Sequence, residues 1–323
     1  MSSNSSLFSS IENDLNVLTR NLNNLVNTNN PLLSSATEYL FLAGGKRLRP
    51  AIVLLVSKAT MGKQELRASH LRLAEISEIL HTASLVHDDV LDDSILRRGV
   101  PSVHNGFGTK IAVLAGDFLF AQSSWYLANL DSLEVVKLIS KVIIDFAEGE
   151  IRQGLNEYNS KLSIEEYLEK SFYKTASLIA ASTKSAAILS QVAPSIAEDL
   201  YHYGRHLGLA FQIVDDILDF TSSTETLGKP ASSDLIKGNL TAPVLFALQK
   251  NPTLSILIQR RFSESTDFEQ AISIVKKTKG IEKARDLAME HAQVAIECLH
   301  NLPNSESTQA LKQLVEYVLE RIY

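Results

Sequence analysis

An acidic cluster occurs twice in this chain, as Asp-Asp-Val-Leu-Asp and as Asp-Asp-Ile-Leu-Asp, each time inside an apolar stretch with helical spacing. Residues four apart lie on one face of a helix, which pairs Asp88 with Asp92 and Asp215 with Asp219. Such like-charge pairs destabilise a helix by about 0.2–0.5 kcal/mol each, and by more when the face is buried. The chain must therefore fold so that a cation offsets the repulsion between these carboxylates. Two solvated acidic patches are the alternative, but this would leave the apolar residues inside each cluster unexplained.

Hard oxygen ligands of this kind suit Mg²⁺, which takes one or two protein carboxylates beside phosphate oxygens and water. The second cluster is expected at the C-terminal end of its helix, where the helix dipole disfavours anions. Both observations indicate a site for a divalent metal and a diphosphate.

Glycine and proline are scarce, at 14 and 8 of 323 residues. Residues 63–98 and 155–193 contain neither, and they show helical spacing without the alternation of strands. The expected fold class is therefore all-α. No linker or charge run divides the chain, which predicts a single domain over residues 1–323.

The spacing predicts about a dozen helices, and the second acidic cluster is followed by a Ser/Thr/Gly-rich loop over residues 221–238. The predicted helices cover residues 11–28, 31–42, 51–60, 66–96, 113–128, 133–155, 164–191, 196–220, 240–250, 267–278, 281–301 and 306–321.

Charge and composition exclude several classes of function. A net charge of −6 and a pI near 5.8 argue against nucleic acid as a partner. The single cysteine, Cys298, excludes an internal disulfide framework and is expected to be a small packed side chain. No segment reaches the roughly 18 charge-free apolar residues of a membrane span, and the polar N-terminus does not resemble a signal or transit sequence.

Basic residues lie beside the acidic features. The run Gly-Gly-Lys-Arg-Leu-Arg-Pro at 44–50 places three cations at the start of a helix, which suits an anion. A solvated basic turn is the alternative for this run. Arg97 and Arg98 follow the first cluster, although cations near a helix C-terminus are favourable in any case. Lys174, Lys229 and Lys237 are uninformative individually.

Taken together, the motifs resemble those of the trans-isoprenyl diphosphate synthases over nearly the whole chain. The motifs are the basic run at 44–50, His-Thr-Ala-Ser-Leu-Val-His-Asp-Asp at 81–89, Arg-Arg-Gly at 97–99, Leu-Ala-Gly-Asp at 114–117, Lys-Thr at 174–175, Phe-Gln-Ile-Val-Asp-Asp at 211–216 and Gly-Lys-Pro at 228–230. Residues 120–129 and 237–243 most resemble the long-chain synthases of cyanobacteria and plastids, in particular the solanesyl diphosphate synthases.

The resemblance implies a helical barrel of the isoprenoid synthase type, with a central apolar cavity flanked by the two clusters. Four carboxylates would hold two or three Mg²⁺ ions against the diphosphate of an allylic substrate, namely Asp88, Asp92, Asp215 and Asp219. Arg97 would contact the same diphosphate. Four basic residues would bind the diphosphate of isopentenyl diphosphate, namely Lys46, Arg49, His81 and Arg98.

The remaining site residues also come from the resemblance. Thr175 and Gln212 would offer oxygen dipoles to an allylic cation, and Lys174 and Lys229 would bind substrate. Without the family, His81 would be interpreted as a core histidine, and His87 is still expected to be one.

The implied activity is Mg²⁺-dependent condensation of isopentenyl diphosphate with an allylic diphosphate. The expected product is the nine-unit solanesyl chain used for plastoquinone, with geranylgeranyl or ten-unit products as alternatives. A class I terpene cyclase normally has a different second metal motif, and a non-catalytic subunit usually loses part of an Asp cluster. Labelled isopentenyl diphosphate separates these alternatives.

Product length is expected to depend on small side chains one turn before the first cluster, Ala83 and Ser84. Aromatic side chains are frequent there in short-chain enzymes, so small ones predict an open tunnel. A deeper floor near Phe118, Phe120 or Trp125 is the alternative, although each of these is expected to be ordinary core.

The family also implies partners and a location. A homodimer is expected, with peripheral membrane contact for product release and without a transmembrane segment. The expected location is the plastid stroma, for a plastid-encoded protein without a transit peptide, or the cyanobacterial cytoplasm.

Overall fold

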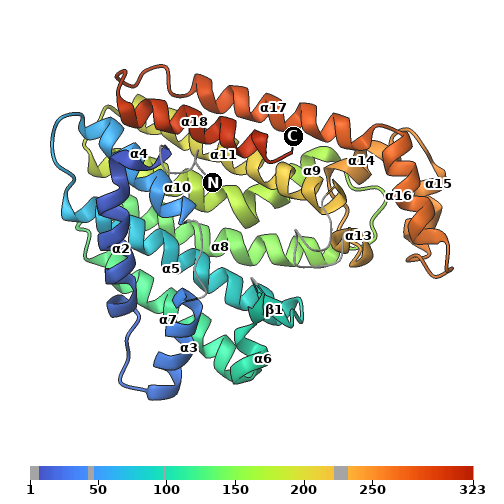
Figure 1. Ribbon diagram of the computed structural model, residues 1–323, viewed down its shortest axis with the longest axis horizontal. Coiled ribbons are helices and arrows are strands. Elements are labelled where there is room, and N and C mark those ends of the chain that lie inside the picture. Colours follow the sequence, from blue (N-terminus) through green and yellow to red (C-terminus); the bar gives the residue numbers. More distant parts are fainter. Residues whose placement is uncertain (1–6, 43–46, 98, 222–231, 323) are drawn as a thin grey trace. The chain divides into compact units, whose positions relative to one another are not determined.

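The computed structural model describes residues 7–42, 47–97, 99–221 and 232–322. Among these residues the elements are helices, apart from one two-stranded antiparallel hairpin (Figure 1). The all-α prediction is therefore confirmed.

Contacts divide the chain into two compact units. Unit 1 comprises residues 1–141, 181–201 and 301–313, and unit 2 comprises residues 142–180, 202–300 and 314–323. The single domain predicted over residues 1–323 stays a prediction.

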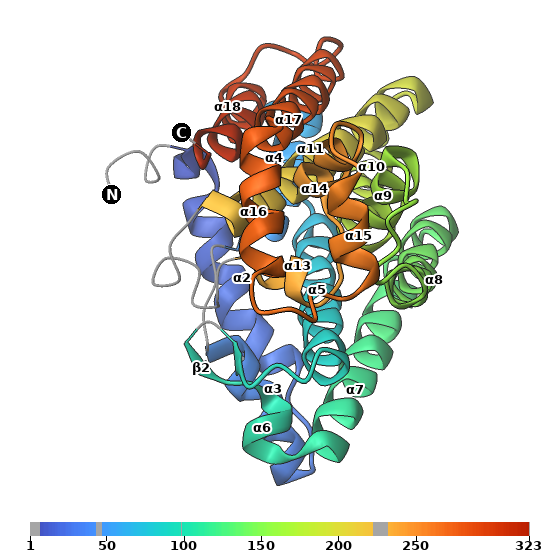
Figure 2. The same cartoon turned by 90° about the vertical axis from the view of Figure 1, so that its right-hand side faces the viewer.

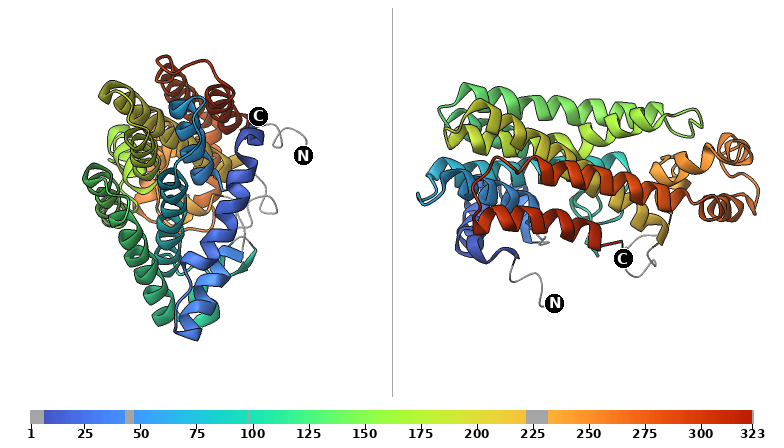
Figure 3. Two further views of the ribbon diagram at one scale, coloured as in Figure 1. Left: turned by 90° about the vertical axis from the view of Figure 1, so that its left-hand side faces the viewer. Right: turned by 90° about the horizontal axis from the view of Figure 1, so that it is seen from above.

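Unit 1 is built around α5 (Ala68–Leu91), which packs along α7 (Thr109–Ala128) and against α4 (Leu48–Met61). Figures 1 and 3 show α5 and α7 running side by side. Both α4 and α5 are apolar on most faces, which is typical of helices buried all round. The other elements of this unit include η1 (Ser9–Ile11), α2 (Glu12–Leu25), α3 (Pro31–Leu42), β1 (Leu96–Arg97), β2 (Val100–Pro101), α6 (Val103–Phe107) and the start of α8 (Leu133–Leu155).

The close packing of α5 on α7 depends on a glycine. The ring of His87 lies over Gly116, where an added Cβ would be 2.2 Å from Nε2. The same Nε2 lies 3.1 Å from the carbonyl oxygen of Val113. His87 thus packs between two helices with a side chain that is 29% exposed, rather than within the core as expected.

The helix predicted over residues 66–96 ends five residues early, at Leu91. Asp93 adopts a positive φ of 50°, and the chain turns into β1, which pairs with β2. Ending at Leu91 leaves Asp88 and Asp89 in the last turn of α5 and Asp92 as its C-cap, where the helix dipole disfavours anions. The early helix end therefore increases the need for a cation at the cluster.

Unit 2 contains a small group of helices that pack on one another (Figure 2). In this group α14 (Ala242–Leu248) contacts α15 (Thr253–Gln259), α16 (Asp267–Lys277) and α17 (Gly280–Glu297). The sequence pattern did not predict α15. The other elements that lie at least partly in unit 2 are α8, α9 (Ile164–Ser171), η2 (Phe172–Ala176), α10 (Ser177–Leu189), α11 (Pro194–Thr221), α13 (Ser233–Ile236) and α18 (Glu306–Glu320).

The single helix predicted over residues 164–191 is interrupted. Between α9 and α10 lies η2, one turn of π-helix. Such turns insert one extra residue, redirect the side chains that follow and occur often at functional sites. Gly208 of α11 packs directly on this turn, because an added Cβ would lie 2.6 Å from Cα and from Cβ of Ala176.

One helix among the described residues, α7, has the length and composition to cross a membrane, whereas the sequence analysis expected no such segment. A third of its most apolar window is buried, and it packs against α3, α5 and α6. Its outer face carries Leu114 and Trp125, and Trp125 is 66% exposed. The expectation that Trp125 is ordinary core is therefore wrong.

We expect Gly208→Ala to destabilise the protein by about 1–3 kcal/mol, because the new methyl group meets the backbone of Ala176. Gly154→Ala is the matched control, since it lies near the end of α8 with no atom within 4 Å of an added Cβ. Helix propensity predicts no loss of stability there. Urea unfolding followed by circular dichroism measures both, and equal midpoints would contradict the close contact.

Candidate active site

The first acidic cluster lies at the end of α5 in unit 1. Asp88 is half-buried, Asp92 is exposed as the C-cap, and Asp89 is only 4% exposed. Adjacent residues of a helix point about 100° apart, so Asp89 faces away from the side that Asp88 and Asp92 share. Two carboxylates of the cluster are therefore accessible to a cation, and the third is directed inward.

The inward carboxylate holds an arginine. Nε of Arg97 donates to Oδ1 and Oδ2 of Asp89 at 3.0 and 3.1 Å, and Nη2 also donates to Oδ1. Both residues line a cavity of about 30 Å³ together with His81, which is large enough to hold water. The predicted substrate residue Arg97 is thus fixed by the cluster itself.

The basic run at 44–50 divides into two roles. Arg47 forms a salt bridge with Glu78 and also donates to the carbonyl oxygen of Phe41, so its charge is used within the fold. Nη1 of Arg49 lies 2.9 Å from Nε2 of His81. An arginine only donates, so Nε2 of His81 accepts and the ring carries its proton on Nδ1. Lys46 and Arg98 lie outside the described residues.

The second acidic cluster lies at the end of α11 in unit 2. Asp215, whose side chain is 38% exposed, accepts a charged hydrogen bond of 2.7 Å from Arg321. The guanidinium of Arg321 also lies 4.9 Å from the ring centroid of Phe211. The sequence analysis missed Arg321, because a lone arginine after the last helix carries no recognisable signal.

Asp219 is 1% exposed, and its carboxylate accepts from the hydroxyl of Ser233 at 3.2 Å and from the backbone N–H of Asp234 at 3.4 Å. These bonds anchor the first turn of α13. A metal at Asp219 would have to replace them, whereas Asp215 presents an accessible carboxylate.

Asp216 is buried at the centre of a hydrogen-bond network. The hydroxyl of Tyr167 donates to Oδ2 at 2.5 Å, and Nε2 of Gln212 donates to Oδ1 at 2.9 Å. Burial, together with the charge of Asp234, raises the pKa of Asp216 to about 7, against the opposing effects of Tyr167, Lys170 and Gln212.

The π-turn presents two predicted residues to different partners. Thr175 donates its hydroxyl to Oε1 of Gln212 at 2.7 Å. Lys174 forms a salt bridge with Glu150 and donates to Oε1 of Gln153 at 3.0 Å. The structure therefore brings Thr175 and Gln212 together and directs Lys174 toward α8. Lys229 lies outside the described residues.

The carboxylates of the two clusters are hard oxygen donors of the kind that Mg²⁺ binds. Among the described residues no group of three or more His, Cys, Asp or Glu side chains is arranged to hold a metal ion by itself. The accessible carboxylates are Asp88 and Asp92 in unit 1 and Asp215 in unit 2. The carboxylates of each unit suit Mg²⁺ by their chemistry, because that ion takes few protein ligands and completes its shell with phosphate and water.

The predicted chain-length positions differ from each other. Ala83 is 0% exposed, whereas Ser84 is half-buried and donates its hydroxyl to the carbonyl oxygen of His81 at 2.9 Å. Because the hydroxyl of Ser84 already donates a hydrogen bond within its own helix, it can face an apolar chain without leaving a donor unpaired. Ser84 therefore has the accessible surface that a tunnel wall needs, and Ala83 belongs to the packed interior.

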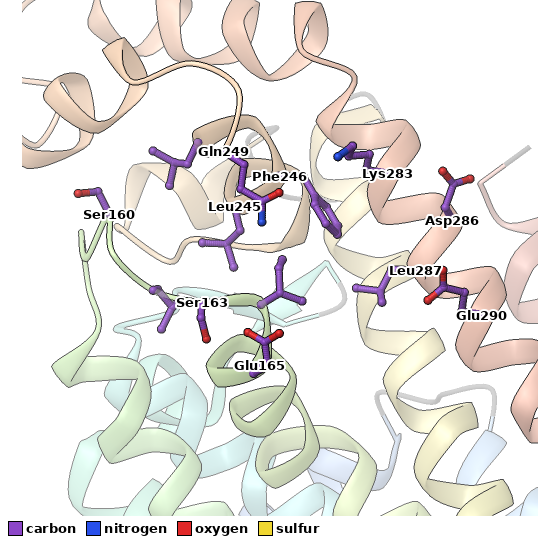
Figure 4. Close-up of a pocket in the computed structure, with 13 residues that line it drawn as sticks. Ser160, Ser163, Glu165, Leu245, Phe246, Gln249, Lys283, Asp286, Leu287 and Glu290 are labelled. Atoms are coloured by element: carbon purple, nitrogen blue, oxygen red, sulfur yellow. The ribbon is translucent and has the colours of Figure 1, made fainter.

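A separate pocket of about 680 Å³ lies in unit 2, lined by residues before and within α9, by α14 and by α17. Figure 4 shows the apolar side chains of Leu245, Phe246 and Leu287 in this pocket, with Lys283 and Asp286 nearby. Of the predicted site residues that the structure describes, none lines it. The pocket is distinct from the acidic clusters.

Comparison with known proteins agrees with these features. The profile of the polyprenyl synthetase family matches residues 30–275. The chain belongs to the polyprenyl synthetase family. It is 69% identical to a prenyl transferase of Cyanophora paradoxa over 323 residues, which cover both chains fully. It is 58% identical over 319 residues to the chloroplastic solanesyl diphosphate synthase 1 of Arabidopsis thaliana, covering 98% of this chain and 79% of the relative.

The fold of this polyprenyl synthetase matches solved structures. A polyprenyl synthase from Caulobacter crescentus, complexed with calcium and isoprenyl diphosphate, superimposes with a TM-score of 0.92 at 33% identity, covering 99% of this chain and 98% of that one. The chain is thus a trans-prenyltransferase that makes long-chain prenyl diphosphates. The family depends on a divalent metal.

The two arginines of the basic run predict different phenotypes. Arg49→Gln should raise the KM for isopentenyl diphosphate at least about 10-fold, because the charge-assisted hydrogen bond expected between Arg49 and the substrate diphosphate is lost. Arg47→Gln should leave Glu78 buried without its cation, which lowers stability by about 3–5 kcal/mol. Steady-state kinetics and thermal unfolding of both variants measure this. A larger KM effect at Arg47 than at Arg49, with unchanged stability, would contradict the assignment.

Proposed function

We propose that this chain condenses isopentenyl diphosphate repeatedly with an allylic diphosphate and releases the nine-unit solanesyl diphosphate used for plastoquinone. The observation that carries the product assignment is the 58% identity to the solanesyl diphosphate synthase of Arabidopsis thaliana across 98% of this chain. Geranylgeranyl and ten-unit products are the alternatives.

The allylic diphosphate is assigned to the accessible carboxylates and to Arg97. Asp88, Asp92 and Asp215 would hold two or three Mg²⁺ ions, with Asp219 as a further ligand if its bonds to α13 are released. When bound, the metal stabilises the negative charge of the leaving diphosphate. Arg97 contributes a fixed guanidinium for the same charge, since Asp89 already restricts its side chain.

Isopentenyl diphosphate is assigned to Arg49 and His81, with Lys46 and Arg98. The 2.9 Å contact between Arg49 and His81 supports this, because it places two groups of one subsite side by side. The forked donors of arginine match phosphate oxygens, whereas Lys46 would act as a point charge. Lys174 and Lys229 are proposed to bind substrate as well.

The reaction breaks the C–O bond of the allylic substrate and leaves an allylic cation and diphosphate. The C=C bond of isopentenyl diphosphate attacks the cation, and the departing diphosphate removes the proton. Thr175 and Gln212 are proposed to direct oxygen dipoles at the cation. The buried side chains of Val86, Val214 and Ile217, next to the clusters, keep water away from it.

A homodimer is proposed as the working assembly. It is supported by the apolar side chains that α7 exposes, among them Val113, Leu114 and Trp125, because exposed apolar patches mark interfaces.

A single prenyl synthase domain is proposed because the family profile runs through residues of both units. Peripheral membrane contact for product release stays a prediction. The proposed location is the plastid stroma or the cyanobacterial cytoplasm, supported by relatives from Synechocystis and from chloroplasts.

The test of the function uses purified protein, labelled isopentenyl diphosphate, Mg²⁺ and an allylic primer. We expect incorporation into long chains, and a fall in turnover of at least about 100-fold, or about 3 kcal/mol, in Asp88→Asn. The fold should stay intact, since the substitution relieves repulsion. Asp93→Asn is the control, because this exposed neighbour lies outside the metal pair and should keep full turnover. Unchanged turnover in Asp88→Asn would refute the metal site.

Product length is tested at the two small residues. Ser84→Phe should shift the products toward short chains, because Ser84 is accessible, and Ser84→Ala should keep the parental length. Ala83→Phe should chiefly lower stability, by about 1–3 kcal/mol, because Ala83 is fully buried. Chromatography of the dephosphorylated products measures the lengths. If Ser84→Phe gave the parental distribution, the growing chain would not pass this residue.

A further inference from the structure

We propose that Asp216 is a positioning residue that fixes which end of the Gln212 amide faces the reacting carbon. This inference rests on the proposed function and deepens it. Four described residues of unit 2 form a chain of hydrogen bonds, from Tyr167 through Asp216 and Gln212 to Thr175. The end of this chain is the pair of oxygens assigned to the allylic cation.

The direction of each bond follows from the groups involved. The hydroxyl of Tyr167 and the NH₂ group of Gln212 donate to the two carboxylate oxygens of Asp216. Nε2 of Gln212 lies 2.9 Å from Oδ1 of Asp216, and this places Oε1 on the opposite side, where it accepts from Thr175 at 2.7 Å. A reversed amide would set its oxygen against the carboxylate oxygen. The carboxylate therefore selects one of the two orientations of Gln212.

The orientation matters because an amide is a dipole. Its carbonyl oxygen is the negative end and stabilises a nearby cation, whereas its NH₂ group is the positive end and destabilises it. The effect is large in a site that excludes water, since the local dielectric is low. A Gln212 free to reverse would present the wrong end for part of the time.

Burial separates Asp216 from its neighbour in the cluster. Asp216 is 3% exposed and each of its carboxylate oxygens accepts a side-chain hydrogen bond, whereas Asp215 is accessible and pairs with Arg321. Gln212 lies four residues before Asp216 on α11, so the two share a helix face. Asp216 thus lies next to the proposed metal ligand Asp215 but acts on the allylic cation by orienting Gln212.

The test is a double-mutant cycle on the full chain. Asp216→Asn replaces one acceptor oxygen by an NH₂ donor, so Tyr167 and Gln212 compete for a single oxygen. We expect kcat to fall about 10- to 100-fold, while both KM values and the Mg²⁺ concentration for half-maximal rate stay within about twofold. In the Gln212→Met background the amide dipole is absent, so Asp216→Asn should lower kcat further by less than about twofold.

Tyr167→Phe serves as a second route if Asp216→Asn fails to fold. It removes one donor to Asp216, and its smaller loss of kcat should likewise vanish in the Gln212→Met background. Tyr203→Phe is the matched control, because it removes another buried tyrosine hydroxyl of unit 2 and should leave kcat unchanged.

Two outcomes would overturn the inference. If Asp216→Asn raised the Mg²⁺ concentration for half-maximal rate about 10-fold or more, Asp216 would be a metal ligand. If Asp216→Asn lowered kcat in the Gln212→Met background as much as in the parent, Asp216 would act independently of Gln212. If the parent enzyme itself failed to condense the two diphosphates, the proposed function would be wrong instead.

Discussion

Adjacent carboxylates on a helix cannot face the same way, and this constraint organises both acidic clusters. In the first cluster Asp89 turns inward onto Arg97, and in the second Asp216 turns inward onto Tyr167 and Gln212. Asp88 and Asp215 keep exposed surface, and Asp215 pairs with Arg321. Each cluster therefore combines the face that is proposed to bind metal with an anchor for a residue that is proposed to act on the substrate.

Charge compensation explains several neighbouring features. Arg321 lies against Asp215, Arg97 against Asp89, and Arg47 against Glu78. Carboxylates in a partly buried site are stable only when cations or hydrogen-bond donors meet them. A metal that binds Asp215 would have to share it with Arg321 or displace that side chain. The basic residues thus belong to the same electrostatic balance as the clusters.

The sequence predicted the all-α fold and both clusters, because helical spacing and paired carboxylates are local patterns. The resemblance assigned Arg49 and His81 to one substrate, and the structure shows the two side chains in contact. The contacts of Arg321 with Asp215 and of Tyr167 with Asp216 were not predicted, since the partners lie far apart in sequence. The π-turn at η2 was not predicted either, because the helical spacing runs through it. Helix ends were also misplaced, as at Leu91, where a hairpin competes with continued helix.

The division of each cluster is tested most directly by a crystal structure with Mg²⁺ and a non-cleavable allylic diphosphate analogue. The account predicts metal–oxygen distances of about 2.1 Å to Asp88, Asp92 and Asp215. It also predicts that Asp89 still holds Arg97 and that Asp216 still accepts from Gln212. Coordination of Mg²⁺ by Asp89 or Asp216 would contradict the account.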